Sequence, residues 1–153
     1  MAATPVRLGI VFLLVNIVGA VVAIVLDLGA RLVLGEVQTG DLGIEVLWQG
    51  SAISAPPPPL VALIAGMFLT TRSGKAVTAG YVLLTLAGLV MTGGVLGEFI
   101  EGISFSGVKQ IVFMMFSIAL AFLAASIAVA SVRELVKKHK RESTDESLAL
   151  GDE

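Results

Sequence analysis

The stretch that decides the fold is SAISAPPPPLVALIAGMFLTTRSGK, residues Ser51 to Lys75. It places four consecutive prolines, Pro56 to Pro59, directly before an apolar run of twelve residues, Leu60 to Thr71. Twelve helical residues cover about 18 Å of a hydrocarbon core that is about 30 Å thick. The run is therefore too short for an ordinary spanning helix, and the way it crosses the membrane sets the topology of the rest of the chain.

Two interpretations of the prolines are open. In one, a short helix begins near Pro57 or Pro58, since proline suits the first helical turn, where its missing N–H costs nothing. In the other, the helix is broken at membrane depth, as in many transporters, and its irregular backbone lies against protein or a water-filled cavity. We favour the short helix, over about 57–72. Its short length predicts a shallow external recess at Trp48, Pro56 and Pro59.

The composition places the chain in a membrane. Of its 153 residues, 56% are hydrophobic and 14% are charged, against about 45–50% and about 25% in soluble domains. The mean hydropathy is +0.97. A soluble domain of this size could not bury so much apolar surface, so we expect an integral membrane protein, and we place it in a prokaryotic plasma membrane.

Four apolar segments predict four spanning helices, at about 8–34, 57–72, 76–98 and 110–132. They form one transmembrane domain, residues 1–134. Residues 135–153 form a basic and then acidic tail that we expect to be disordered at its end. A signal peptide is the alternative for the first segment, but the segment is longer than a hydrophobic signal region of about 7–15 residues and no clean cleavage site follows it.

The connection between the first two segments, residues 35–55, predicts a short helix in the membrane interface. Asp41, Glu45 and Gln49 recur every four residues, and Trp48 on another side is a typical interfacial anchor. An irregular loop is the alternative.

The basic residues predict the orientation. Eight of the ten lie at the N-terminus, in the turn after the second segment or in the C-terminal tail, and only Arg31 and Lys109 lie on the other side. This bias predicts that both termini are cytoplasmic. The fold class is therefore an all-α integral membrane protein, a four-helix transmembrane bundle with an interfacial helix in its first external loop.

Small and polar residues recur at alternating spacings of four and three along three of the segments. Such faces let helices approach closely, and we interpret them as the inner seam of the bundle; a lining for a solute path is the alternative. The positions are Gly9, Leu13, Asn16, Ala20, Ala23, Asp27 and Ala30; Gly80, Leu84, Ala87, Met91, Gly94, Glu98 and Glu101; and Ser117, Ala121, Ala124, Ala128 and Ser131. Gly93 and Gly97 form a further close-packing pattern that could join two chains or two helices of one chain.

Five polar residues are candidates for a site. Asn16 lies inside the first segment, where its amide should face the bundle and hydrogen-bond across it. Asp27 and Arg31 are four residues apart, a spacing that favours an ion pair on a helix. Together with Glu98 and Glu101 they would meet at the external mouth, either as a structural salt-bridge cluster or as an acidic cation or proton site.

The basic run after the fourth segment predicts contact with anionic lipid headgroups. Its residues are Arg133, Lys137, Lys138, Lys140 and Arg141. The run is short and lacks interleaved aromatic residues, so nucleic acid is not an expected partner.

Catalysis has little support in the sequence. The chain has no cysteine and a single histidine, His139, so we expect no metal, no cofactor and no enzyme activity. We expect a non-catalytic accessory, scaffold or self-associating subunit, with the lipid bilayer and a second membrane chain as partners. A small cation- or proton-coupled transporter or channel is the alternative.

Overall fold

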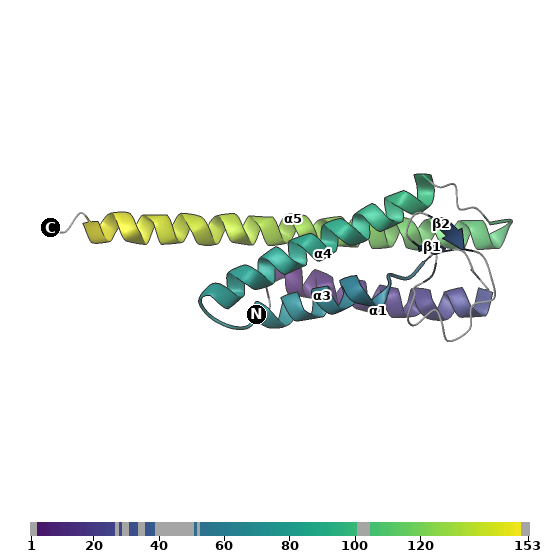
Figure 1. The fold of residues 1–153 in the computed structure, drawn as a ribbon, viewed down its shortest axis with the longest axis horizontal. Coiled ribbons are helices and arrows are strands. Elements are labelled where there is room, and N and C mark those ends of the chain that lie inside the picture. The colour runs from purple at the N-terminus through teal and green to yellow at the C-terminus, as the bar shows by residue number, and fades with distance from the viewer. Residues whose placement is uncertain are drawn as a thin grey trace.

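The structure, a computed structural model, describes residues 3–26, 28, 31–33, 36–38, 51, 53–100 and 105–150. These residues form four helices and one short hairpin of strands. In chain order the elements are α1 (Thr4–Leu26), β1 (Arg31–Val33), β2 (Glu36–Gln38), α3 (Pro57–Leu69), α4 (Lys75–Ile100) and α5 (Val108–Leu150). The helices run along one long axis, and α5 extends well beyond the others (Figure 1).

The two ends of the molecule differ, and we name them by what they hold. The hairpin end is where α1 finishes, α5 begins and the antiparallel strands β1 and β2 lie, with β1 against α4. The tail end holds the N-terminus, the turn between α3 and α4, and the protruding part of α5 (Figure 1).

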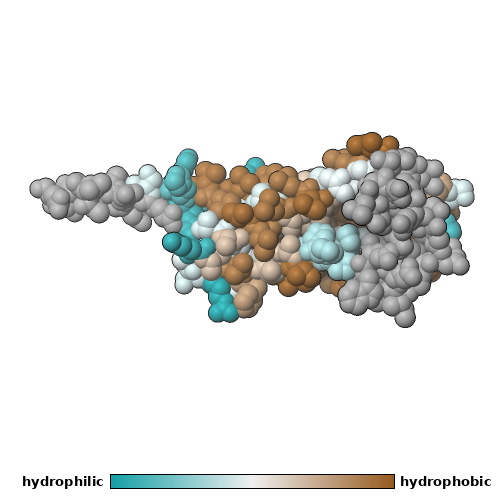
Figure 2. All heavy atoms as spheres, in the orientation of Figure 1, coloured by the Kyte–Doolittle hydropathy of each residue, from teal (hydrophilic) through white to brown (hydrophobic). Residues whose placement is uncertain are grey.

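Three helices are long and apolar enough to cross a membrane: α1, α4 and the Val108–Arg141 part of α5. This marks the chain as an integral membrane protein, as its composition predicts. Large apolar side chains are exposed along these helices, and an apolar band covers the middle of the molecule, bordered by hydrophilic residues toward the tail end (Figure 2). Helix α3 is also apolar, but its 13 residues span only about 20 Å.

The first helix is shorter than the sequence predicts, so the expected span 8–34 is wrong at its far end. Helix α1 finishes at Leu26, and Arg31 is already in a strand. The Leu28 amide donates to the Ala23 carbonyl oxygen at 2.9 Å, a bond that reaches back five residues instead of four and closes the helix. The apolar residues that follow the helix therefore enter a hairpin. The predicted interfacial helix lies largely outside the described residues.

The last helix is longer than predicted, and the expectation of a disordered tail end is wrong as far as Leu150. Helix α5 has 43 residues, and neither glycine nor proline occurs between Val108 and Leu150 to interrupt it. Within the tail, Lys137 pairs with Glu134 at 2.7 Å, and the Thr144 hydroxyl donates to the Lys140 carbonyl oxygen at 2.9 Å. The helix continues to the residue before Gly151, a typical stop residue.

Glycines set the closest helix contacts. A Cβ at Gly80 of α4 would lie 2.9 Å from the Gly66 carbonyl oxygen of α3, and one at Gly88 would lie 2.6 Å from the Ala124 carbonyl oxygen of α5. Side chains at these positions would push the helices apart. Helix α4 thus packs between α3 and α5, and α1 packs against α5 and α3.

The core consists of two apolar clusters. The larger one joins all four helices and contains Phe12, Leu63, Tyr81, Leu84, Ala87, Met91, Leu120, Ala124 and Ile127. The smaller one lies toward the hairpin end and contains Ala23, Leu28, Ile53 and Phe113. Edge-to-face contact between Phe105 and Phe113, with ring centroids 5.4 Å apart, supports the smaller cluster.

The predicted seam of α4 is wrong at Gly94, which is exposed. Helix α3 runs antiparallel to α4, with Gly66 beside Gly80 and Leu84. In this register the first residue of α3, Pro57, lies level with about Met91 of α4. Beyond that level α3 has no residues left to cover α4.

Candidate functional site

The centre of the candidate site is the backbone that leads into α3, which we call the proline segment (Ser51 and Ile53–Pro59). Pro56 is the N-cap of α3, with extended backbone angles φ −69° and ψ 158°, and Pro57 and Pro58 follow in its first turn. An α-helix normally leaves its first four N–H groups without partners. In α3 these positions are Pro56 to Pro59, which have no N–H. The helix can therefore begin in an apolar environment without a cap.

The last N–H before the prolines belongs to Ala55, and Asn16 of α1 accepts its hydrogen bond. The distance from the Ala55 nitrogen to Asn16 Oδ1 is 2.6 Å, and Asn16 is 6% exposed. The structure thus places Asn16 inward, and its partner is a backbone group. This bond joins α1 to the start of α3.

The backbone before Ala55 satisfies its own polar groups. Ser51 and Ser54 exchange backbone N–H to carbonyl bonds of 3.1 and 3.2 Å, and their buried hydroxyl oxygens lie 2.8 Å apart. The Ile53 amide donates to Ser51 Oγ at 3.3 Å. A Cβ on Gly19 of α1 would overlap the Ile53 carbonyl oxygen, so this glycine admits the proline segment against α1.

The proline segment lies level with the middle of α1. Its partner Asn16 is the thirteenth of the 23 residues of α1, close to the middle of a spanning helix. Irregular backbone at this depth is tolerated only where protein or a water-filled cavity surrounds it. In the structure the helix is short and starts at proline, and the non-helical backbone before it lies against α1.

The predicted external cluster is described only in part. Asp27 and Glu101 lie outside the described residues, and the side chain of Arg31 is also outside them. Because Arg31 begins β1, the helical four-residue spacing expected for its pairing with Asp27 does not form. Glu98 is half-buried near the end of α4, and within the described part of the chain its Oε2 atom is buried and has no hydrogen-bond partner.

The predicted recess is also described in part. Trp48 lies outside the described residues, Pro56 is exposed and Pro59 is half-buried. Beside the short α3, Gly93 and Gly94 of α4 have no described atom within 4 Å of an added Cβ. The shortfall of α3 therefore leaves part of α4 uncovered by the described chain.

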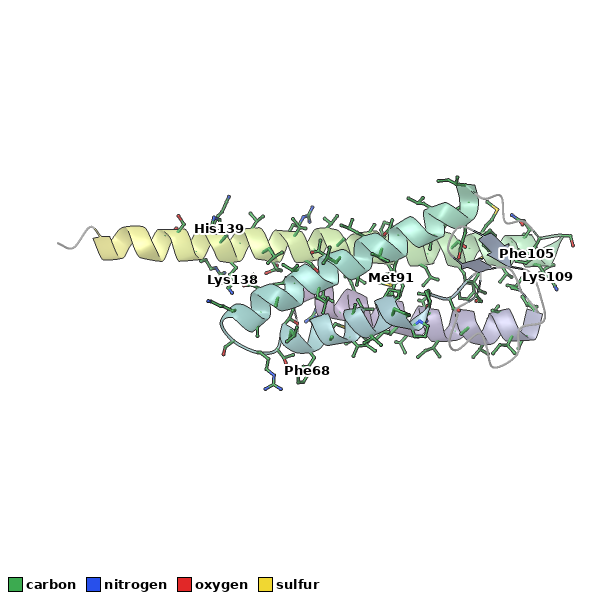
Figure 3. All side chains as sticks on the ribbon, viewed as in Figure 1. Phe68, Met91, Phe105, Lys109, Lys138 and His139 are labelled. Carbon is green, nitrogen blue, oxygen red and sulfur yellow. The ribbon has the colours of Figure 1, made fainter. Side chains whose placement is uncertain are left out.

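The five basic residues predicted to contact lipid headgroups have different roles. Arg133, Lys140 and Arg141 are exposed, whereas Lys137 pairs with Glu134. Lys138 Nζ donates to the Gly74 carbonyl oxygen at 2.9 Å and to Thr78 Oγ1 at 2.6 Å. Figure 3 shows Lys138 directed toward the turn before α4 and His139 on another side of α5. Lys138 thus ties α5 to the α3–α4 turn.

Sequence reasoning missed three features of this region. It did not assign Ala55 as the partner of Asn16, although the last N–H before four prolines was the available signal. It left Gly19 out of the seam of α1. It also gave no indication that the hydroxyls of Ser117 and Ser131 are buried without a partner among the described residues. No group of three metal-binding side chains gathers in the described ranges.

In comparisons with protein-family models, curated proteins and solved structures, nothing matches this chain.

Proposed function

We propose that this chain is a non-catalytic subunit of the prokaryotic plasma membrane that associates with a second membrane chain through α4. The four helices form a transmembrane bundle in which the proline segment and α3 together make one crossing. The termini are cytoplasmic. In support, the Lys138 bond to Gly74 holds the basic tail beside the α3–α4 turn, and that turn carries Arg72 and Lys75. Basic residues therefore gather at the tail end, as expected for a cytoplasmic face.

The uncovered glycines of α4 carry the proposal of association. Five helical glycines (Gly9, Gly19, Gly66, Gly80 and Gly88) allow close contacts that a Cβ would obstruct. Gly93 and Gly94 make no such close contact with the described chain. Each nevertheless destabilises the helix by about 1 kcal/mol relative to alanine. Gly93 also begins the Gly93-x-x-x-Gly97 pattern, which is typical of close contact between membrane helices. A second copy of the chain, or a larger membrane partner, accounts for this cost.

The experiment compares Gly93→Ile with the wild-type chain in mild detergent, by light scattering and by chemical crosslinking. We expect a dimeric or larger wild type, and a variant shifted to the monomer. Ala79→Ile is the matched control, because it places the same side chain on the same helix about 21 Å away, at a position that is also exposed. A monomeric wild type, or an oligomer that Gly93→Ile leaves intact, would rule out self-association through this face.

The second candidate is a small cation- or proton-coupled transporter or channel with an acidic external mouth. The buried Oε2 atom of Glu98, which has no partner among the described residues, favours it, because ionisable groups inside a membrane often serve transport. The proline start of α3 disfavours a transporter that binds anionic groups at the end of a broken helix. Broken helices of transporters bind anionic groups through free N–H donors, and the first turn of α3 has none.

Flux across liposomes separates the two candidates. We expect that purified protein produces no monovalent-cation or proton flux above that of empty vesicles. Flux that Glu98→Gln abolishes, with Lys75→Gln as an unaffected control, would instead establish the transporter.

A further inference from the structure

An apolar groove of about 360 Å³ runs between α1 and α5 on the outside of the molecule. It is lined by Leu14, Val15, Val18, Met115, Phe116 and Ala119. The walls formed by Leu14, Val18 and Met115 are 53–66% exposed. No polar side chain contributes to the lining, so only a hydrocarbon ligand matches its chemistry.

The groove lies at one depth in the membrane. Val15 is near the middle of α1 (Thr4–Leu26), and the lining extends toward the hairpin end as far as Val18 of α1 and Met115 of α5, about one helical turn. The packing of Gly19 against the Ile53 carbonyl oxygen and the Phe116 ring fixes α1 relative to α5 at this level. The groove is therefore formed in the protein by itself and does not need a ligand to open it.

A positive charge lies above the groove on the same row of α5. Lys109 is seven residues, or about two helical turns, before Phe116 and ten residues before Ala119, so it lies over the groove in helical register. Figure 3 places Lys109 at the hairpin end of α5. The rise from Lys109 to Ala119 is about 15 Å, which equals half of a hydrocarbon core about 30 Å thick.

This spacing matches a phospholipid in one leaflet. Its phosphate lies at the interface, and its acyl chains end near the middle of the bilayer. We propose that the groove holds one acyl chain of a phospholipid from the leaflet at the hairpin end, with the lipid phosphate at Lys109. The lysine ammonium has three N–H donors, so it can share a phosphate with a group of the protein. This proposal does not depend on the proposed association through α4.

The experiment measures binding of dioleoyl phosphatidylglycerol to the full chain in dodecylmaltoside by native mass spectrometry. Ala119→Phe and Val18→Trp fill the groove from opposite walls, and the exposed Val18 tolerates a larger residue without a change in packing. We expect each to weaken lipid binding about tenfold, because many small dispersion contacts are lost together. Lys109→Gln should weaken it about fivefold, the effect of one basic residue near a membrane surface.

Matched controls distinguish a site from the general lipid shell. Ala79→Phe adds the same ring to an exposed position of α4, and Lys75→Gln removes an exposed charge at the tail end; neither should change binding. The dioctanoyl lipid has chains too short to reach Ala119, so Ala119→Phe should leave its binding unchanged.

Three results would overturn the proposal. The first is that Ala119→Phe and Val18→Trp both bind the lipid as well as the control variants do. Another is an equal effect of Ala119→Phe on the long and short lipids. The third is that the groove variants lose a peak of the dimer and keep the peak of the lipid-bound chain, which would make the groove an interface between two copies.

Discussion

Replacing Asn16 by leucine should destabilise the protein by breaking its bond to the Ala55 amide. The bond is 2.6 Å long and partly buried, and Asn16 is 6% exposed, so the abandoned N–H would face an apolar leucine side chain. A buried donor without a partner costs about 1–3 kcal/mol, but measured couplings inside membranes average about 0.6 and reach about 1.7 kcal/mol. We therefore expect a loss of about 1–2 kcal/mol.

A double-mutant cycle isolates this bond from other effects of the substitution. Ala55→Pro removes the same N–H from the other side, and Ser54 is already in an extended bridge, which suits a residue before proline. In the Ala55→Pro background, Asn16→Leu has no donor to abandon. The two changes should therefore couple by about 1–2 kcal/mol.

The assay is unfolding by sodium dodecyl sulfate in mixed micelles, followed by far-ultraviolet circular dichroism. Ile17→Leu is the control, because Ile17 is 60% exposed on the same helix and should change stability by less than about 0.5 kcal/mol. A coupling within about 0.3 kcal/mol of zero would refute the role assigned to Asn16.

Three further predictions concern the helix contacts and the tail. Gly80→Val should destabilise the protein by about 1–3 kcal/mol in the same assay, because its Cβ would lie 2.8 Å from the Thr70 nitrogen. Gly93→Ala, at an open site, should instead stabilise the monomer by up to about 1 kcal/mol. Equal effects of the two substitutions on stability would contradict the packing described for α4. Lys138→Met should lower the thermal unfolding temperature in detergent more than Lys140→Met, since only Lys138 bonds to the α3–α4 turn. Glu98→Gln should leave stability unchanged or increase it, because the glutamine amide is neutral and keeps the shape of the side chain, whose buried Oε2 atom has no partner among the described residues; a clear loss would show that Glu98 is paired.

The sequence predicts the start of α3 correctly because its cause is local. Proline has no N–H and a fixed φ, so four prolines before an apolar run favour a helix that begins within them. The depth of that start could not be predicted in the same way. It depends on which residue of α1 lies beside Ala55, and that is a property of tertiary packing.

The errors at the helix ends have a related origin. Hydrophobicity predicts burial in lipid but does not choose between helix and strand for a short apolar run, so the residues after Leu26 were assigned to the first span. Gly29 and Gly35 in that run were the available warning. In the tail, charge content predicted disorder, whereas the continuous helix-forming sequence after Val132 extends α5.

The sequence predicts that Asn16 belongs to the candidate site, but it does not predict that the partner of Asn16 is the Ala55 N–H. A lone asparagine in an apolar segment must face the protein interior, and Asn16 does. The groove between α1 and α5 has no signature in the sequence, because its residues are ordinary lipid-facing apolar side chains. Only the close approach at Gly19 determines that Val18 and Met115 line the same depression.

The shortness of α3 has a consequence for how the protein enters the membrane during synthesis. Thirteen apolar residues are too few to partition into lipid as an independent segment, which needs about 20. The turn from Thr70 to Gly74 joins α3 directly to α4. We therefore expect the two helices to enter the membrane together as a hairpin, in which packing against α4 stabilises α3.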